Sequence, residues 1–268
     1  MATSGPGFRP EEPNVARMYD YMLGGKDNFP ADREAVRRTF DVLGEDVVRG
    51  TVQQNRRFLG RAVRHLAREA GIRQFLDIGT GLPTMRNVHE VARAEAPDSR
   101  VVYVDNDPMV ISHAGYTLHG VDGTAIVGRD LQDPDEIVAD ARVRSVLSFD
   151  QPVAVLLVAI LHFLADDDDP ARIAAALMAS VPPGSFLVIS HGSADHYAAA
   201  NEAAEVYKDA SSGLYLRNRL AVRSLFGGLP LVDPGDVVWT SQWHPDADTP
   251  PVDSPGGASL WCGIARKP

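Results

Sequence analysis

The fold of this chain is decided by one stretch, Phe75-Leu76-Asp77-Ile78-Gly79-Thr80-Gly81. Its first four residues are predicted to form a strand. Gly79 and Gly81 would then let the backbone turn sharply and approach a ligand closely, because glycine adopts positive φ at no steric cost. Thr84 stands where the dinucleotide fingerprint G-x-G-x-x-G has its third glycine, which disfavours a nicotinamide or flavin cofactor.

Four more short apolar runs follow along the chain and alternate with helical stretches. We expect strands at 101–105, 125–127, 153–158 and 185–190. Strands that alternate with helices form a parallel sheet with right-handed crossovers. Two final apolar runs, at 237–239 and 260–264, have no long helix between them and are predicted to form an antiparallel addition. The sequence therefore predicts an α/β fold with a seven-stranded, mostly parallel sheet.

The chain before this sheet is predicted to be helical from 14 to 73, with apolar residues at helical spacing. A Gly-Gly pair and Pro30 interrupt the helical pattern with a loop. Residues 1–13 contain repeated Gly and Pro and are expected to form a flexible tail. We therefore divide the chain into this tail, a helical cap (14–73) and a binding domain (74–268) that packs as one unit with the cap.

The composition argues against several classes of protein. The 268 residues carry a formal net charge of −10, and an acidic surface repels phosphate backbones, so nucleic-acid binding is disfavoured. The single cysteine, Cys262, cannot form an internal disulfide or a Cys/His zinc site by itself. No run of about 18 apolar residues predicts a transmembrane helix, and no signal-peptide core follows Met1. We expect a cytoplasmic protein that binds neither nucleic acid nor membrane. The acidic run 166–169 is interpreted as a helix-capping loop before Pro170, and no metal site is predicted.

Acidic residues follow two of the predicted strands, where open parallel sheets bind their ligands. Asp105 ends the second strand and is placed to accept hydrogen bonds from both hydroxyls of a ribose. Asp107 is better suited to cap the next helix. Asp130 follows the third strand and is placed to accept from the exocyclic amine of an adenine, while Leu131 covers the ring face. The order of these groups along successive strand ends indicates a nucleoside-containing ligand.

With these residues, the sequence resembles the class I methyltransferases, in which D-x-G-x-G is followed by an acid at the end of the next strand and then by Asp-Leu. It is more specifically similar to a bacterial S-adenosylmethionine-dependent methyltransferase family long known only as a domain of unknown function. The strings that carry this resemblance extend over nearly all of the chain after the tail: R-M-Y-D-Y-M-L-G-G-K-D-N-F (17–29), F-L-D-I-G-T-G-L-P-T (75–84), N-V-H-E-V-A (87–92), V-V-Y-V-D-N-D-P (101–108), L-H-F (161–163) and D-D-D-D-P (166–170). The resemblance implies a Rossmann-like class I fold with a helical N-terminal cover, and S-adenosylmethionine as the cofactor.

The resemblance also implies a cofactor pocket of four parts. The methionine end is expected to meet Asp77, Gly79, Thr80 and Gly81, and the ribose is expected to meet Asp105. The adenine is expected to lie against Asn106, Asp130 and Leu131, and the sulfonium against Ala159 and Ile160. No acid is required at the sulfonium, because methyl transfer neutralises its charge and a polar pocket would stabilise the reactant over the transition state. Position and orientation are therefore expected to supply most of the rate.

The segment from Tyr19 to Phe29 is unusually dense in Tyr, Asp, Lys and Asn for a simple turn. One interpretation is a lid over the cofactor, in which Tyr19 or Tyr21 stacks on it and Lys26 meets a carboxylate. The alternative is a capped helix–loop–helix that buries its tyrosines for structural reasons.

Two histidines are candidates for a catalytic base, because His162 follows the fourth strand and His191 follows the fifth. A lone histidine after an apolar run is more often structural. The predicted reaction is methyl transfer from S-adenosylmethionine to an O, N or C nucleophile on a small molecule. Two alternatives are a non-catalytic S-adenosylmethionine-binding regulatory protein and a nucleotide-dependent oxidoreductase. The sequence leaves the oligomeric state open.

Overall fold

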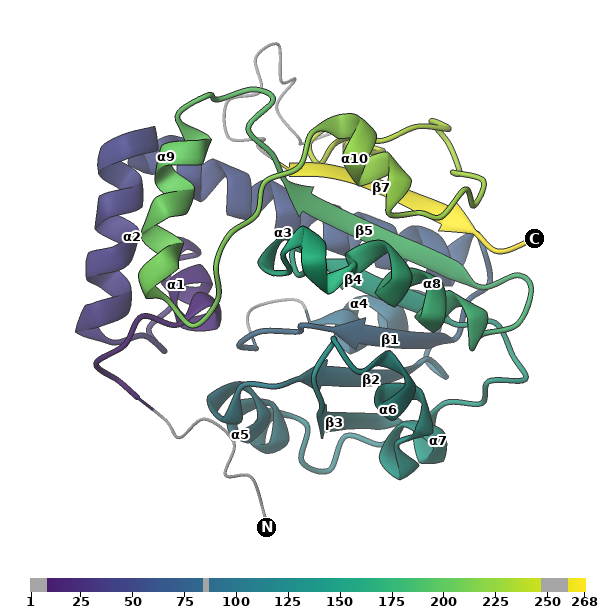
Figure 1. Ribbon diagram of the computed structural model, residues 1–268. Coiled ribbons are helices and arrows are strands. Elements are labelled where there is room, and N and C mark those ends of the chain that lie inside the picture. The colour runs from purple at the N-terminus through teal and green to yellow at the C-terminus, as the bar shows by residue number, and fades with distance from the viewer. Residues whose placement is uncertain (1–8, 84–86, 247–259) are drawn as a thin grey trace.

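The computed structural model describes residues 9–83, 87–246 and 260–268. One mixed sheet with helices on both faces forms its centre, and a group of helices from the N-terminal part of the chain stands beside the sheet (Figure 1). None of the helices in the described ranges is long and apolar enough to cross a membrane. The part of the predicted tail before residue 9 lies outside the described residues.

The sheet has seven strands in the order β3-β2-β1-β4-β5-β7-β6. The strands are β1 (Gln74–Ile78), β2 (Arg100–Asp105), β3 (Thr124–Gly128), β4 (Ala154–Val158), β5 (Phe186–Gly192), β6 (Val238–Trp239) and β7 (Leu260–Arg266). The first five are parallel, while β7 runs antiparallel to both β5 and β6. The predicted fold class is thereby confirmed. The strand order reverses between β1 and β4, and this is the switch point at which such sheets bind ligands.

The helices follow the predicted alternation with the strands. They are α1 (Val15–Met22), α2 (Pro30–Leu43), α3 (Glu45–Arg68), α4 (Val88–Glu95), α5 (Pro108–Thr117), α6 (Pro134–Ala139), α7 (Ala141–Val146), α8 (Pro170–Ala179), α9 (Ala200–Glu205) and α10 (Arg219–Ser224), with short 3-10 turns η1 (Leu161–Phe163), η2 (Asp166–Asp168) and η3 (Val206–Asp209). Proline begins four of them, where its missing N–H costs no helical hydrogen bond. Asp107 caps α5 and Asp169 caps α8 by accepting backbone N–H bonds, as predicted.

Each face of the sheet has its own apolar core. One core packs α6, α7, α8 and α10 against the sheet, with Ile137, Ile173 and Leu177 fully buried. The other packs α3, α4 and α5 against the opposite face, with Phe58 and Leu66 fully buried. Because both faces are covered, the parallel strands are mainly apolar, and β1 and β4 are buried at every residue.

A third, smaller core joins α1, α2 and the start of α3 away from the sheet. It contains Met18, Val36 and Val52, together with Val206 from η3. Here α9 lies alongside α2, so a segment from late in the chain completes the N-terminal helical group (Figure 1). The helix α3 contributes to this core at one end and to the sheet core along the rest of its length.

Candidate functional site

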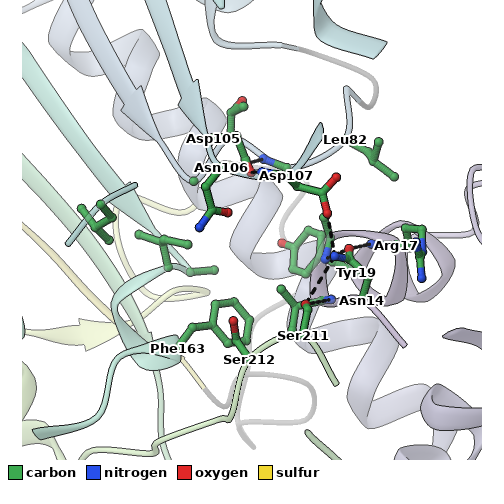
Figure 2. Close-up of a pocket in the computed structure, with 18 of the residues that line it drawn as sticks. Asn14, Arg17, Tyr19, Leu82, Asp105, Asn106, Asp107, Phe163, Ser211 and Ser212 are labelled. Carbon is green, nitrogen blue, oxygen red and sulfur yellow. Dashed lines mark hydrogen bonds between the residues drawn. The ribbon is translucent and has the colours of Figure 1, made fainter. Parts of the chain in front are cut away.

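A cavity of about 690 Å³ lies at the carboxyl ends of β1, β2, β3 and β4. Residues that follow these four strands form one part of its wall. The segment that leads into α1, the side chains on α1 and α3 that face the sheet, and residues 210–212 form the rest. In Figure 2, Asp105, Asn106 and Asp107 lie on one side of the space, and Phe163 and Ser212 lie on the other.

The turn after β1 brings backbone to the cavity wall. Gly79 and Gly81 have φ values of 72° and 65°, a region that side-chain-bearing residues rarely adopt. A Cβ on Gly79 would lie 2.4 Å from the Ile160 side chain, so only glycine fits there. A Cβ on Gly81 would meet no atom of the described residues within 4 Å. The turn therefore packs tightly against the end of β4 at Gly79 and leaves open space at Gly81.

Asp77 lies at the base of this turn and is 6% exposed. Its carboxylate accepts a hydrogen bond from the Thr80 hydroxyl at 3.2 Å. Burial raises the pKa of Asp77 to about 6, and the carboxylate of Asp105 adds to this effect. Arg56 and Thr80 act in the opposite direction without cancelling the cost of burial. A buried carboxylate of this kind is suited to a cationic ligand group that would restore its lost solvation.

The ends of β2 and β3 are joined by side chains. The Asp105 carboxylate accepts from the N–H of Gly81 at 2.9 Å and from the N–H of Asp107 at 3.0 Å. Burial is the main reason that the pKa of Asp105 is raised. The Asn106 amide donates to Asp130 at 2.9 Å, so these two exposed residues form a polar edge. Leu131, which is buried, follows directly and lines the cavity.

The end of β4 has an unusual backbone. Ala159 has a φ of 56°, and its N–H donates to both the carbonyl and the hydroxyl of Ser190, at 3.1 and 3.0 Å. A non-glycine residue held in this region is strained and is retained only where its surroundings fix it. Ala159 and Ile160 both line the cavity.

In the segment from Tyr19 to Phe29, Tyr19 faces the cavity, whereas Tyr21 and Lys26 do not. Tyr19 lines the cavity, but Tyr21 packs on Phe40 with ring centroids 6.4 Å apart, and Lys26 is exposed on the loop. Neither Tyr21 nor Lys26 is among the described residues that line the cavity. The structural alternative therefore accounts for the position of Tyr21, and cofactor contacts for these two residues stay predictions that the geometry does not support.

The loop in this segment is organised by the carboxylate of Asp20. It accepts from the N–H of Asp27 and the side-chain amide of Asn28, both at 2.9 Å. A Cβ on Gly25 would lie 1.9 Å from the same carboxylate. These contacts explain why the loop is rich in Gly, Asp and Asn.

A polar junction, formed by Pro13, Asn14, Asp107 and Ser211, closes one side of the cavity. The Asn14 amide donates to the Asp107 carboxylate at 2.6 Å and to the Ser211 hydroxyl at 3.3 Å. The Ser211 N–H donates to the carbonyl of Pro13 at 2.9 Å. Figure 2 shows Asn14 between Asp107 and Ser211. The junction joins three segments that are far apart in the sequence.

His162 and His191 are not among the described residues that line the cavity. His162 is buried and accepts from the N–H of Gly192 at 3.0 Å. His191 is fully buried, with its Nε2 atom 2.9 Å from Arg217 and its Nδ1 atom donating to Gly192. Burial lowers the pKa of both, that of His191 to about 4, so both are neutral near pH 7. Their contacts are those of structural histidines, and a role for either as a base stays a prediction that the geometry does not support.

The acidic run 166–169 has structural partners. Asp169 accepts from the N–H of Arg172 as the cap of α8, and Asp166 binds the guanidinium of Arg217 at 2.6 Å. Within the described part of the chain, no group of three or more His, Cys, Asp or Glu side chains is gathered to hold a metal ion.

The remaining sequence-predicted residues come together at the cavity. Its lining includes Tyr19, Asp77, Gly79, Thr80, Gly81, Asp105, Asn106, Asp130, Leu131, Ala159 and Ile160. These residues offer acceptor groups at three strand ends and a glycine turn that leaves space at Gly81. Such a set fits a ligand with an ammonium group, vicinal hydroxyls and an aromatic amine, which are the features of S-adenosylmethionine.

Sequence reasoning missed several residues of the cavity wall. They are Asn14, Leu59, Phe163, Leu164, Ala210, Ser211 and Ser212. Most of them lie outside the strand ends, on segments that reach the cavity through helix packing, and no local pattern marks them.

A family model described as S-adenosyl methyltransferase matches residues 3–268. The chain is 39% identical to a protein from Thermobifida fusca YX named as a candidate methyltransferase, with a TM-score of 0.90 and coverage of 96% of each chain. It is 40% identical to a DUF574 family protein from Streptomyces avermitilis, with a TM-score of 0.92 and coverage of 97% of this chain and 99% of that one. An S-adenosylmethionine-dependent methyltransferase from Anabaena variabilis shares the fold, with 11% identity, a TM-score of 0.52 and coverage of 99% and 100%. No curated protein matches the chain.

Proposed function

This chain belongs to the S-adenosyl methyltransferase family, and from that premise we propose that it methylates a nucleophilic O, N or C atom of a small molecule with S-adenosylmethionine as the donor. The observation that carries the proposal is the convergence of four strand ends on one cavity, with acceptor groups in the order that the donor molecule requires. The cofactor would supply an electrophilic methyl group on its sulfonium. The residues of the chain would bind it, orient it and exclude water.

The turn after β1 would hold the methionine end. The Asp77 carboxylate, which is desolvated by its burial, would pair with the ammonium group and so recover the cost of that burial. The open space beside Gly81 would let the ligand approach the backbone.

The ends of β2 and β3 would hold the adenosine. Each carboxylate oxygen has two lone pairs, so Asp105 can keep its bonds to Gly81 and Asp107 and still accept from ribose hydroxyls. Asn106 and Asp130 form the polar edge that would meet the adenine amine, and Leu131 would cover the ring.

The methyl group would point toward the end of β4, where Ala159 and Ile160 offer backbone and apolar side chains. No described acid lies on this part of the wall, which agrees with the argument that a charged group there would stabilise the sulfonium reactant over the transition state. Catalysis would therefore rest mainly on holding the donor and acceptor atoms at reacting distance.

The acceptor would lie beside Tyr19, Phe163, Leu164, Ala210 and Ser212, which are aromatic, apolar or neutral polar residues. The cavity extends past the predicted cofactor residues to this wall, which supports a catalytic role rather than a purely regulatory one. The polar junction closes one side, which favours a small molecule over a polymer. The antiparallel β7 is a further argument against a nucleotide-dependent oxidoreductase.

The cysteine content bears on the compartment in which the protein acts, and its relatives bear on the kind of organism. The single cysteine, Cys262, is buried and free, which suits the reducing cytoplasm. We propose a cytoplasmic, bacterial enzyme, since the relatives described above are bacterial.

Calorimetric titration with S-adenosylmethionine, S-adenosylhomocysteine and NAD tests the cofactor site. We expect the first two to bind and NAD not to bind, and binding of NAD alone would contradict the proposal. Release of S-adenosylhomocysteine can then be followed with panels of small phenols, amines, thiols and carbon acids. A protein or nucleic-acid substrate methylated in place of every small molecule would overturn the proposed acceptor class.

A further inference from the structure

A continuous series of hydrogen bonds, which we call the Asn55 chain, joins the end of β4 to α1. The N–H of Ala159 donates to the Ser190 hydroxyl at 3.0 Å, and that hydroxyl donates to the Asn55 side-chain carbonyl at 2.6 Å. The Asn55 amide then donates to the Tyr19 hydroxyl at 2.9 Å. Asn55 is 2% exposed and lies on α3, between the sheet and the cap.

Every member of the Asn55 chain has a fixed donor or acceptor role. The Tyr19 hydroxyl accepts from Asn55 and donates to the carbonyl of Val52 at 3.3 Å. Burial raises the pKa of Tyr19, so its hydroxyl keeps its proton. The three bonds of the Asn55 chain and the further bond from Tyr19 to Val52 therefore all run in one direction, and no hydroxyl in the series is free to reverse.

The two ends of the Asn55 chain are the parts of the site that methyl transfer must align. At one end is Ala159, with its strained φ of 56°, whose N–H is held by Ser190. At the other end is Tyr19, which lines the cavity from α1. Asn55 itself lines the cavity between them. A buried amide whose donor and acceptor sides are both used in this way restrains two elements at once.

We propose that Asn55 is a positioning residue that sets the spacing between the methyl-donor end of the site at Ala159 and the acceptor wall at Tyr19. The assignment of these two ends rests on the proposed function. Asn55 acts through Ser190 and Tyr19, and its own atoms do not take part in the reaction. Loss of its side-chain bonds would uncouple the Tyr19 ring from the Ser190 hydroxyl, which helps the Ser190 carbonyl to hold the Ala159 N–H.

The test compares Asn55→Leu with Gln54→Leu, a matched control on the same helix. Gln54 is partly buried, and among the residues that the structure describes it is not part of the cavity lining and its side-chain oxygen has no hydrogen-bond partner. The first readout is hydrogen exchange of the Ala159 amide in the protein without ligand. We expect Asn55→Leu to speed this exchange by a factor of about 3 to 10, the effect of losing one buried hydrogen bond, and Gln54→Leu to leave it unchanged.

The second readout is the ratio of the dissociation constants for S-adenosylmethionine and S-adenosylhomocysteine, which differ in the methyl group and its charge. We expect Asn55→Leu to change this ratio, because the wall that meets the methyl group has moved. If the substitution only loosened the fold in general, it would weaken the binding of both ligands by the same factor and leave the ratio of their dissociation constants at its wild-type value. Should Asn55→Leu not fold, Ser190→Ala breaks the same series at nearly constant volume and takes its place.

Unchanged exchange at Ala159 in the folded variant overturns the proposal, and so does a change in both affinities with a constant ratio. A wild-type protein that binds neither ligand contradicts the proposed function instead. In that case the exchange measurement alone still decides whether Asn55 holds the end of β4.

Discussion

The carboxylate of Asp105 accepts a hydrogen bond from the backbone N–H of Gly81 at 2.9 Å, so the end of β2 holds the turn that follows β1. The same carboxylate accepts from the N–H of Asp107, which begins the approach to α5. One side chain thus fixes the two loops that would receive opposite ends of the cofactor. These two hydrogen bonds preorganise both loops for the cofactor, which lowers the cost of binding.

Replacement of Asp105 by alanine is expected to weaken S-adenosylmethionine binding by about 1–3 kcal/mol, the cost of unmet hydrogen bonds to a polar ligand. The released Gly81 turn would add to this loss. Calorimetric titration measures the change, with Asp150→Ala as the control because Asp150 is exposed and does not line the cavity. Equal affinity in a folded Asp105→Ala protein would disprove the ribose assignment.

The two glycines of the turn are expected to respond differently to substitution. Gly79→Ala should lower the free energy of unfolding by about 2–5 kcal/mol, because strain at positive φ adds to the clash with Ile160. Gly81→Ala should cost only the strain, about 1–2 kcal/mol, since its Cβ meets no atom within the described part of the chain. Urea unfolding measures both variants. The bulkier Gly81→Val should also lose cofactor affinity by filling the approach, and normal binding by that variant would contradict the role of this loop.

The stability of the empty protein is expected to depend on pH through Asp77. Its folded-state pKa of about 6 lies above the ordinary value of 3.8, so the folded state holds the proton more tightly than the unfolded state. Stability is then greatest below pH 4 and falls as the pH rises through 6, by on the order of 3 kcal/mol. The variant Asp77→Asn should be more stable than the wild type at pH 8 and gain nothing at pH 4. Urea unfolding at both pH values checks this, and a difference that does not vary with pH would count against it.

Cofactor binding should show the opposite dependence on pH. The ionised Asp77 carboxylate is the form that pairs with the ammonium group, so affinity should fall by about tenfold per pH unit below 6. In Asp77→Asn, binding should be weak and nearly independent of pH over the same range. Titration calorimetry between pH 5 and 8 provides the measurement. A wild-type affinity that stays constant across this range would place the ammonium group elsewhere.

The polar junction is expected to slow the escape of the cofactor. Asn14→Ser keeps a residue that caps α1 but cannot span the distance to Asp107. Loss of this bond should raise the dissociation rate of S-adenosylhomocysteine by a factor of about 2 to 10, which stopped-flow displacement measures. Asn218→Ser makes the same change at the cap of α10, outside the cavity lining, and should have no effect. Equal rates for Asn14→Ser and the wild type would show that the junction does not gate the site.

Arg217 is expected to matter more for stability than the acid it pairs with. Its side chain is 8% exposed and donates to the carbonyls of Leu161 and Leu164 as well as to Asp166, whose side chain is 91% exposed. Arg217→Met should therefore cost about 3–5 kcal/mol by leaving buried acceptors unpaired. Asp166→Asn should cost less than about 1 kcal/mol, as for a surface pair. Urea unfolding separates the two cases, and equal losses would refute this account.

The strands of the sheet and the residues at their ends were predictable because they depend on local patterns. Apolar runs mark buried strands, and the carboxyl ends of parallel strands share one edge, so Asp77, Asp105 and Asp130 had to approach each other. Contacts between distant segments carry no such signal. Asn14 and Ser211 are 197 positions apart, and the packing of α9 and η3 beside α2 brings them together.

The local sequence is a poor guide to the segment before α9, where side chains hold the backbone in turns. The alanine-rich sequence from 194 to 210 looks helical throughout, but in the structure the α-helix α9 covers only Ala200–Glu205, and the 3-10 turn η3 continues it to Asp209. The Ser193 hydroxyl accepts from the N–H of Asp195, and the Asp195 carboxylate binds both the N–H of Arg219 and the indole of Trp261. These contacts hold the start of the segment outside a helix, and two of the three involve residues that the local sequence does not contain.

The shared helix α3 also determines how the molecule must move. One end of α3 packs in the cap and the rest packs against the sheet, so this single helix connects the cap to the sheet. A rotation of the cap as a block would therefore have to bend α3 or separate it from one of the two cores. Ligands would then enter and leave by a local movement of the segment before α1, which would break its contacts with Asp107 and Ser211. The sheet and the rest of the cap would keep their positions. The envelope of the molecule in solution, as small-angle X-ray scattering records it, should be the same with and without ligand.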